Sequence, residues 1–494
     1  MKHTKIVATI GPASQEKLMM EKMIKAGLNV ARLNFSHGTY RHHGMLIRNF
    51  RSVSTKLNVK TAIIQDLQGP RIRIGSLPPQ GIKINGSNEV ALVIEENYSA
   101  KKKSSVIQIP IQYPQLYQDL KVGDQILIDD AAIELKVVKI GNKIIYCKVV
   151  TPGVIKSHKG MNFPSTLIKC PPITKKDLQD VEFGIKNGVD FVAMSFVKEA
   201  SEIVSLRKKI LALEKKYHTE EKFNFDKRAK GRVHTRIIAK IERREAIKNF
   251  DAILEEVDAI MIARGDLGIE MPFEELPLMQ KSMIEKCRKA GKPVIVATQM
   301  LDSMTRNPLP TRAEVSDVAN AVLDGTDAIM LSGESASGKY PLKAVQVMSR
   351  VAKEMERREI TEAEAEEKKF KNSSSMNQII SFVAQDLAKD VNSATLIVCA
   401  TVSGYTAKNI CRFRPGIPIV ALTPSKKTLN QLALSWGVNG YFMPFDASFD
   451  DLLVKIKKLL VKNKLAKKGD LSVIVAGYPF SYKSQSNLIK VETV

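Results

Sequence analysis

Residues 235–242 read TRIIAKIE and residues 259–266 read AIMIARGD. Each stretch is a short apolar run that ends in charged residues, which is typical of a buried strand whose end reaches a polar surface. Six similar runs occur elsewhere: KIVATIG (5–11), LNVARLNF (28–35), TAIIQDLQ (61–68), VDFVAMSF (189–196), PVIVATQM (293–300) and DAIMLSG (327–333). Helix-like segments lie between them, and several end in a helix-terminating Gly. Eight strand–helix alternations predict an α/β fold, a parallel (β/α)8 TIM barrel.

One connection interrupts this alternation. After strand three come short β-like runs: VALVIEE (90–96), SVIQIP (105–110), QILIDDAAIELKVV (125–138) and IIYCKVV (144–150). We expect residues 70–169 to form a small inserted β-barrel domain over the mouth of the main barrel, which takes residues 1–69 and 170–345. A long helix (341–359) and a charged, Ser-rich junction (363–375) follow. Renewed strand-like runs then predict a C-terminal open α/β domain within 346–494.

Composition restricts the class of protein. The chain has 494 residues, 44% of them apolar, which is enough for more than one core. No run of eighteen apolar residues predicts a membrane span, and the N-terminus enters a strand-like pattern without a signal peptide. The five cysteines show neither CxxC nor zinc-ligand spacing. These features indicate a reduced, cytoplasmic location.

The net charge of +24 admits a nucleic-acid partner as one interpretation. We favour a lysine-rich solvated surface, because the densest clusters, AKKKSS (100–105) and KIKKLLVKNKLAKKGD (455–470), contain no aromatic residues for base stacking. The second cluster continues an amphipathic helix whose apolar face, Leu453, Ile456, Leu460 and Val461, we expect to pack on the core rather than on a membrane.

Polar residues follow all but the first of the eight predicted strands, at the end where the chemistry of such barrels lies. They are Arg32, Asn34, Ser36, Asp66, Ser195, Lys240, Glu242, Arg264, Asp266, Thr298, Gln299, Ser332 and Glu334. The stretch GESASGKYP (333–341) resembles a phosphate-binding loop, but Tyr340 stands where that loop needs a Ser or Thr hydroxyl. We therefore interpret it as the turn after strand eight.

Three of these residues suggest a metal site. Lys240 and Glu242 are two apart on a strand and project to one side, and Asp266 ends the next strand. Two carboxylates suit Mg²⁺ or Mn²⁺, and a neighbouring lysine can neutralise a phosphoryl group or an enolate. Arg32 and Arg73 add donors for phosphate. The alternative for Lys240 and Glu242, a buried structural ion pair, stays open from the residues alone.

Longer motifs resemble one family. They are KIVATIGPAS (5–14), ARLNFSHG (31–38), IIQDLQGPRIR (63–73), IIAKIE (237–242), IMIARGDLGIE (260–270), VIVATQMLDSM (294–304) and PTRAEVSDVANAVLDGTDAIMLSGESASGKYP (310–341). Together, and in this order, they resemble pyruvate kinase of the bacterial type. The resemblance runs along the whole chain and implies phosphoryl transfer from phosphoenolpyruvate to ADP, giving pyruvate and ATP in the last step of glycolysis.

The resemblance also implies roles for single residues. Lys240 would stabilise the migrating phosphoryl group, Arg32 would meet the substrate phosphate, and Glu242 and Asp266 would hold Mg²⁺. The Gly265 backbone and the Thr298 hydroxyl would receive the substrate carboxylate, with Thr298 also in the path of proton delivery. The implied nucleotide contacts are Asn34, Phe35, Ser36, His37, Arg73 and Lys159.

One departure concerns potassium. Many members hold K⁺ with residues matching Asn34, Ser36, Asp66 and the backbone of Leu67, and read D-T-K-G-P-E from the aspartate onward. This chain reads DLQGPR (66–71), which resembles a potassium-independent branch with Leu-Gln-x-x-Lys. We expect activity without K⁺, with the Arg71 guanidinium occupying or mimicking the potassium charge; the alternative is that Arg71 faces solvent or pairs with Asp66.

The resemblance further implies a homotetramer and a phosphorylated effector. Ser403, Gly404, Tyr405 and Thr406 match the effector phosphate loop, and Thr423 and Ser425 are possible additions. The final segment (477–491) lacks the glycine-rich loop of fructose-bisphosphate-activated members, so a sugar monophosphate or AMP is expected. We interpret HTEEKFNFDKRAKGRVHTR (218–236) as an elongated surface loop.

Two rival functions remain at this point. A metal-dependent aldolase acting on a pyruvate enolate could use a similar carboxylate pair, although the inserted domain and Lys240 argue against it. A basic scaffold that binds RNA rests only on the net charge.

Overall fold

The computed structural model describes residues 2–98, 106–164, 166, 168–219, 221–226, 229–362, 376–390, 394–445, 448–477 and 486–494. The cluster AKKKSS, the junction 363–375 and residues 478–485 of the final segment lie outside the described residues.

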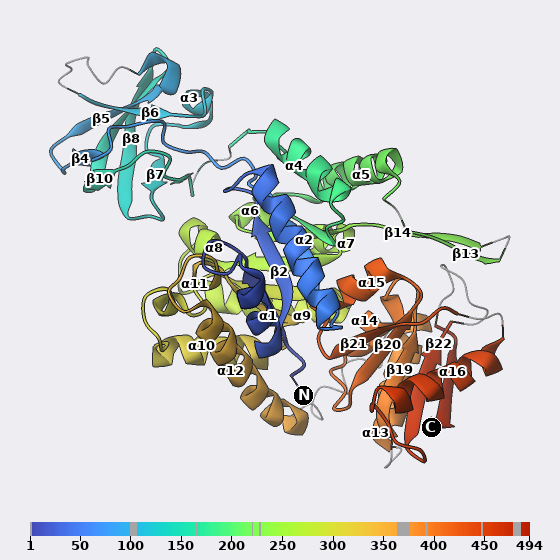
Figure 1. The fold of residues 1–494 in the computed structure, drawn as a ribbon. Helices are drawn as coiled ribbons and strands as arrows, with labels where there is room; N and C mark the ends of the chain where they lie inside the picture. Colours follow the sequence, from blue (N-terminus) through green and yellow to red (C-terminus); the bar gives the residue numbers. More distant parts are fainter. Residues whose placement is uncertain are drawn as a thin grey trace.

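Eight strands close into a barrel in the order β1-β18-β17-β16-β15-β12-β3-β2, and every neighbouring pair is parallel (Figure 1). Their bounds are β1 (Lys5–Thr9), β2 (Leu28–Asn34), β3 (Ala62–Asp66), β12 (Phe191–Met194), β15 (Arg236–Ile241), β16 (Ala259–Ala263), β17 (Val294–Ala297) and β18 (Ala328–Leu331). These are the eight predicted runs, so the predicted (β/α)8 barrel is confirmed.

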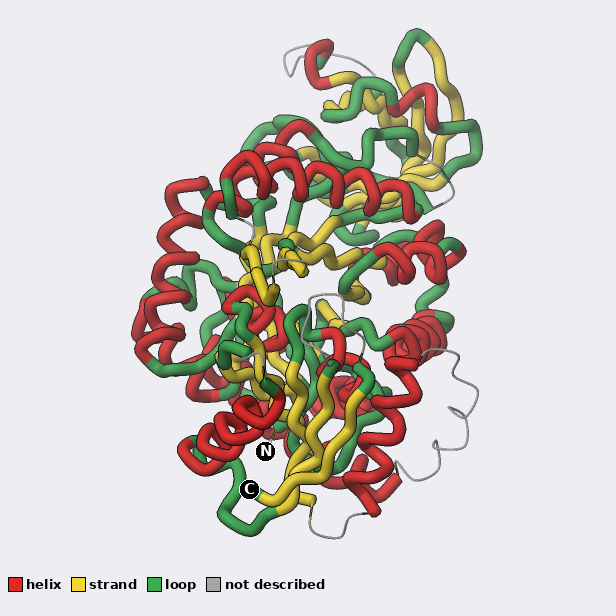
Figure 2. Tube along the Cα trace, turned by 90° about the vertical axis from the view of Figure 1, so that its right-hand side faces the viewer, coloured by secondary structure: helices red, strands yellow, loops and turns green. Residues whose placement is uncertain are grey.

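Helices surround this barrel (Figures 1 and 2). They are α1 (Lys17–Ala26), α2 (Tyr40–Lys56), α4 (Lys175–Lys186), α5 (Ala200–Tyr217), α6 (Arg244–Lys248), α7 (Phe250–Glu256), α8 (Arg264–Glu270), α9 (Leu276–Ala290), α10 (Arg312–Leu323), α11 (Gly333–Ala336) and α12 (Pro341–Glu362). Gly27 and Gly291 end α1 and α9 in the left-handed conformation, as their positions in the sequence predict. The stretch GESASGKYP forms the turn after β18 and contains α11.

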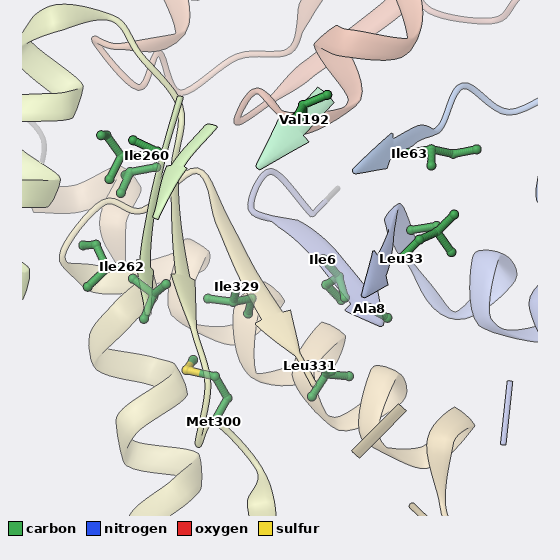
Figure 3. Packing of buried hydrophobic residues seen from close by; sticks show 14 of the residues in the cluster. Ile6, Ala8, Leu33, Ile63, Val192, Ile260, Ile262, Met300, Ile329 and Leu331 are labelled. Atoms are coloured by element: carbon green, nitrogen blue, oxygen red, sulfur yellow. The ribbon is translucent and has the colours of Figure 1, made fainter. Parts of the chain in front are cut away.

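The barrel strands are apolar on both faces because both are covered. Ile6 and Ala8 of β1 belong to the layer between strands and helices, shown in Figure 3, whereas Val7 between them belongs to the interior cluster. The same alternation places Ile237, Ala239 and Ile241 in the outer layer. Lys240 is two residues from Ile238, which belongs to the interior cluster, so Lys240 also faces the barrel interior.

The inserted segment forms a separate β unit with its own apolar core (Figure 1). Its main sheet has the order β11-β7-β8-β9-β5-β6, and β10 pairs with β4. The bounds are β4 (Ile82–Ile84), β5 (Glu89–Ile94), η1 (Glu95–Asn97), β6 (Ile107–Ile111), α3 (Leu116–Asp119), β7 (Gln125–Ile128), β8 (Ile133–Gly141), β9 (Ile144–Thr151), β10 (Gly153–Ile155) and β11 (Met161–Asn162). The sheet curls as a half-barrel, which confirms a β insertion at the predicted place.

The C-terminal part is an open sheet in the order β21-β20-β19-β22-β23, with helices on both sides. Its elements are α13 (Met376–Asp390), β19 (Ala394–Ala400), α14 (Tyr405–Cys411), β20 (Ile419–Thr423), α15 (Lys426–Gln431), η5 (Leu432–Leu434), β21 (Val438–Phe442), α16 (Phe449–Lys462), β22 (Leu471–Ala476) and β23 (Leu488–Thr493). Ala433 and Leu434 of η5 belong to the barrel's interior cluster. This unit therefore closes the N-terminal end of the barrel, opposite the mouth.

Two local predictions were wrong. The expected surface loop at 218–236 contains a β-hairpin, in which β13 (Glu221–Asp226) pairs antiparallel with β14 (Ala229–Val233). In α16, Leu453, Ile456 and Leu460 are buried as expected, but Val461 is 48% exposed because it lies past the edge of the apolar face. In the described part of the chain, no helix is both long and apolar enough to cross a membrane.

Two helical glycines give a test of the packing. A Cβ added at Gly184 of α4 would lie 2.0 Å from Oε1 of Gln65, a fully buried residue of β3. We expect Gly184→Ala to lower the free energy of unfolding by about 1–3 kcal/mol through overpacking. Gly44 of α2 meets the flexible end of Arg48 at 3.3 Å. Gly44→Ala should stabilise by about 0.5–1 kcal/mol through helix propensity. Thermal unfolding midpoints that move in the same direction would contradict this packing.

Candidate active site

A buried cluster of charges occupies the mouth of the barrel. Nζ of Lys240 lies 2.8 Å from Oε1 of Glu242 and 3.2 Å from Oδ1 of Asp66. It also donates to the Ser195 hydroxyl at 2.8 Å. Nε of Arg32 donates to the other oxygen of Asp66 at 2.6 Å. Four strands, β2, β3, β12 and β15, thus bring these side chains together.

The two basic and two acidic side chains stabilise each other's charges. Burial opposes ionisation of Lys240, but Asp66 and Glu242 outweigh it and raise the lysine pKa above its ordinary value. Burial likewise opposes ionisation of Asp66, but Lys240 and Arg32 hold the pKa of this carboxyl below its ordinary value. The ammonium and the Asp66 carboxylate are therefore both charged at neutral pH.

Glu242 differs from Asp66 in the sign of its shift. Burial raises the pKa of Glu242, Lys240 opposes this, and the negative charge of Asp266 adds to the rise. The backbone N–H of Phe196 fixes Glu242 by donating to its Oε2 at 2.6 Å. Two carboxylates that repel each other at the end of adjacent strands favour a cation between them. Among the described residues, no group of three or more His, Cys, Asp or Glu side chains could hold a metal ion, so substrate or solvent oxygens would complete such a site.

Thr298 stands in a strained conformation at the end of β17. Its φ is 68° and that of Gln299 is 54°, in the left-handed region that a β-branched residue rarely adopts. The Thr298 hydroxyl accepts from the backbone N–H of Gly265 at 2.7 Å, and the Arg264 guanidinium donates to its carbonyl at 2.9 Å. This strain places the hydroxyl and the Gly265 amide side by side.

The inserted domain contacts the barrel at the mouth through Arg71. Its guanidinium lies 3.5 Å from Asp266 of the barrel and 3.3 Å from Asp130 of the insertion. In the described part of the chain Arg71 has no ion pair with Asp66, and its side chain is 27% exposed. The Asn162 amide also donates to Glu270 across the same boundary at 3.4 Å.

The remaining expected nucleotide contacts gather near this boundary. Arg73 donates to the carbonyl of His158 at 3.0 Å, and Lys159 pairs with Asp129 at 2.8 Å. Burial, with the positive charges of Arg73 and Arg32, lowers the pKa of His37. The neighbourhood of that imidazole is thus positively charged.

The loop after β2 is held by its own groups. The Asn34 side-chain oxygen accepts from the amide of Ser36 at 3.0 Å, and the ring of Phe35 stacks on His43 at 4.0 Å. The backbone N–H of Leu67 donates to the carbonyl of Ala193 in the barrel.

At the expected effector loop, Gly404 has φ 79° and opens α14. The Thr406 hydroxyl shares a hydrogen bond with that of Ser486 at 2.9 Å, and Tyr405 is exposed. Thr423 and Ser425, the possible additions to this loop, are both fully buried. The Ser425 hydroxyl accepts from the amide of Thr428 and caps α15.

Two protein-family models match the chain over most of its length. "Pyruvate kinase, barrel domain" matches residues 1–345, and "Pyruvate kinase, alpha/beta domain" matches residues 378–492. The chain belongs to the pyruvate kinase family. As a pyruvate kinase it transfers the phosphoryl group of phosphoenolpyruvate to ADP and forms pyruvate and ATP. The aldolase and RNA-scaffold interpretations are thereby set aside.

Single relatives agree with the family models. The pyruvate kinase of Clostridium acetobutylicum is 39% identical over 494 residues, with both chains covered completely. That of Geobacillus stearothermophilus is 41% identical, covering 99% of this chain and 80% of its own. The crystal structure of a pyruvate kinase from Cryptosporidium parvum superposes with a TM-score of 0.89 at 35% identity, covering 100% of this chain and 96% of that one.

Sequence reasoning missed several residues that shape this pyruvate kinase site. Ser195 was noted only as a strand end, yet it contacts Lys240 and also donates to the carbonyl of Leu67 at 2.7 Å. Thr9 was not singled out, although its hydroxyl accepts from Arg32 at 2.9 Å. Asp66 was assigned only to potassium. The alternation of side chains along each strand predicts that all three residues face the barrel interior. That alternation does not identify the side chains with which they form hydrogen bonds.

Ser195 offers a test of this network. Ser195→Ala should lower kcat for pyruvate formation about ten-fold, because Lys240 loses a hydrogen bond that helps to fix its position. Thr326→Val is the matched control, since it removes another buried hydroxyl, which bonds to the carbonyls of Val294 and Ala328 at the opposite end of the barrel. An equal loss of kcat in both variants would show a general packing effect and contradict the role of Ser195.

Proposed function

We propose that the charged cluster at the barrel mouth carries phosphoryl transfer in this pyruvate kinase, with the roles expected from the family. The observation that supports the proposal is the contact of Lys240 with both Asp66 and Glu242 beside Arg32. We also propose the domain division of residues 1–69 and 170–345 for the barrel, 70–169 for a lid and 346–494 for a regulatory domain.

Lys240 and Arg32 bind and orient the anionic substrate. The side chain of Lys240 is 10% exposed and that of Arg32 is 11% exposed. Their charges therefore act in a poorly solvated site. Lys240 neutralises charge on the phosphoryl group as it leaves the enolate oxygen, and Arg32 orients the phosphate. The transfer needs positioning and charge neutralisation more than covalent chemistry.

Pyruvate kinases use Mg²⁺, and Glu242 and Asp266 are the residues we propose to hold it, because oxygen ligands suit this hard cation. When bound, it would neutralise phosphate charge. Gly265 N–H and the Thr298 hydroxyl bind the substrate carboxylate, and Thr298 lies in the path that delivers a proton to the enolate carbon. Asn34 to His37, Arg73 and Lys159 contact the nucleotide, and the inserted domain excludes water when it closes.

Lys240→Met tests the central assignment. It removes the ammonium and should lower kcat by about three orders of magnitude or more, as expected when a preorganised charge is lost. Formation of pyruvate is followed with ADP in an assay coupled to lactate dehydrogenase. Lys240→Arg, which keeps a charge in the cluster, and circular dichroism of both variants separate chemistry from unfolding. A folded Lys240→Met enzyme with near-normal turnover would overturn the assignment.

We also propose that this enzyme works without K⁺. Three of the four expected potassium ligands already accept hydrogen bonds from protein groups: Asp66 from Arg32, Asn34 from Ser36, and the carbonyl of Leu67 from Ser195. Arg71 adds a fixed positive charge at the edge of the site, 3.5 Å from Asp266. A bound potassium ion would be repelled by these cations.

We expect turnover in buffers free of sodium and potassium, with tetramethylammonium as the cation, to stay within about two-fold of turnover in KCl. The reason is that the Arg71 guanidinium already supplies a positive charge at the expected potassium site. Arg71→Gln should lose activity in tetramethylammonium and regain part of it in KCl. Loss of most turnover of the unaltered enzyme without K⁺ would contradict the proposal.

Assembly and regulation follow the family in our proposal. A homotetramer is supported by an apolar stripe on α13 that the single chain leaves exposed: Met376 57%, Ile379 45% and Val383 43%. Residues Ser403 to Thr406 are proposed to bind a sugar monophosphate or AMP in a cytoplasmic enzyme. The carbonyl of Ser403 accepts from the Arg236 guanidinium. Because Arg236 and Lys240 lie on the same strand, β15, this contact offers a route from effector to active site.

A further inference from the structure

The short loop between β2 and α2 carries the proposed nucleotide contacts at residues 34–37. Two of its carbonyl groups accept hydrogen bonds from helices outside the loop. Nζ of Lys176, on α4, donates to the carbonyl of Phe35 at 2.7 Å. Nε2 of His43, on α2, lies 2.8 Å from the carbonyl of His37. Neither donor is among the residues assigned above to substrate, nucleotide or metal.

The surroundings of His43 decide which ring nitrogen carries its proton. A carbonyl oxygen can only accept, so Nε2 is the donor to His37. The other nitrogen, Nδ1, is buried and has no hydrogen-bond partner among the described residues. Burial lowers the pKa of His43, against the opposing effect of its bond to the His37 carbonyl. His43 is therefore a neutral imidazole at pH 7, and its single N–H donates to the loop.

The face of the same imidazole supports the loop as well. It stacks on the ring of Phe35, with centroids 4.0 Å apart and 9° between the planes. Phe35 is only 3% exposed, and its ring also packs against Phe183 of α4 with a centroid distance of 6.0 Å. The Phe35 side chain is thus an anchor packed between α2 and α4.

Lys176 is itself held in place. Its Nζ pairs with Oδ2 of Asp180, four residues along α4, at 2.6 Å. Oδ1 of Asp180 accepts from the hydroxyl of Tyr40, the first residue of α2, at 2.8 Å. Asp180 is fully buried, so its charge depends on these two donors. The series Tyr40, Asp180, Lys176 joins α2 to α4 and ends on the carbonyl of Phe35.

These bonds bear on nucleotide binding because a carbonyl oxygen is partly negative and repels a phosphate that it faces. The two donors engage the carbonyl oxygens of Phe35 and His37 with the helices instead. Inside the loop, the Asn34 side chain accepts from the amide of Ser36. A loop that is ordered before its ligand arrives spares binding the cost of ordering it.

We propose that His43 and Lys176 are positioning residues for the nucleotide, an inference that rests on the proposed nucleotide role of this loop. They fix the carbonyls of His37 and Phe35 and thereby keep residues 34–37 in the conformation that binds ADP. Arg32 is fixed separately, by Asp66 and Thr9. Loss of either positioning residue should therefore impair the use of ADP and spare that of phosphoenolpyruvate.

Steady-state kinetics with ADP and phosphoenolpyruvate varied separately tests His43. His43→Phe keeps a ring that can stack on Phe35 and removes the N–H. It should raise KM for ADP at least five-fold and leave kcat and KM for phosphoenolpyruvate within about two-fold, as expected when binding energy for one substrate is lost. His43→Gln, whose side-chain amide can donate at a similar reach, should restore KM for ADP to within about two-fold. Equal rises in both KM values, or no rescue by His43→Gln, would overturn the role of His43.

Lys176 has a matched control on its own helix. The side chains of Lys176 and Lys186 are 46% and 47% exposed, and each pairs with an acidic residue four positions away. Lys176→Met should raise KM for ADP at least three-fold, whereas Lys186→Met should leave it within 1.5-fold, where 1.5-fold is roughly the scatter expected for a surface ion pair. Equal effects of the two variants would overturn the role of Lys176. Because Lys176 is half-exposed, this pair carries the test if thermal unfolding shows that His43→Phe does not fold.

His37→Ala separates this inference from the proposed function on which it rests. It removes an imidazole assigned to the nucleotide but keeps the carbonyl to which His43 donates, and it should raise KM for ADP. A rise in His37→Ala with none in His43→Phe and Lys176→Met would overturn the positioning role and leave the nucleotide role of the loop intact. An unchanged KM for ADP in all three variants would overturn both.

Discussion

The salt bridges of Lys240 with Asp66 and Glu242 are the constraint on which the mouth of the barrel depends. Breaking a buried pair by removing one partner is strongly destabilising, because it leaves an uncompensated charge. Here the ammonium lies between two carboxylates, and Arg32 completes the neutralisation of Asp66. The cluster is stable only if four strands keep their register. Barrel closure and active-site geometry are therefore one requirement.

The balance of charge explains why a divalent cation suits this site. Lys240 and Arg32 neutralise two carboxylates, Asp66 and Glu242, and Asp266 adds a further negative charge beside Glu242. The substrate brings additional negative charge as phosphate and carboxylate. A cation at Glu242 and Asp266 offsets both, while Arg71 reaches the same aspartate from the inserted domain. Asp266 is thus both a ligand of the proposed metal site and a contact of the inserted domain.

The two ends of the barrel have different roles that are connected through β15. Lys240 lies near the C-terminal end of β15, at the barrel mouth. Arg236 lies at the N-terminal end of the same strand and contacts the C-terminal domain at Ser403. Ala433 and Leu434 of that domain pack into the barrel interior. A strand with fixed length and parity is a rigid connection between such contacts. Movement of the C-terminal domain would therefore be transmitted along β15 to Lys240.

The sequence by itself determined the eight strands, the place of the insertion, the C-terminal sheet and the side of β15 on which Lys240 and Glu242 lie. These follow from local apolar periodicity and from strand parity, which neighbouring residues specify. Only the tertiary structure decided that Ser195 contacts Lys240, that Thr9 contacts Arg32, and that Arg71 meets Asp266 rather than Asp66. Each of these depends on atoms far apart in the chain, whose distances are set by the packing of whole elements and not by any local pattern.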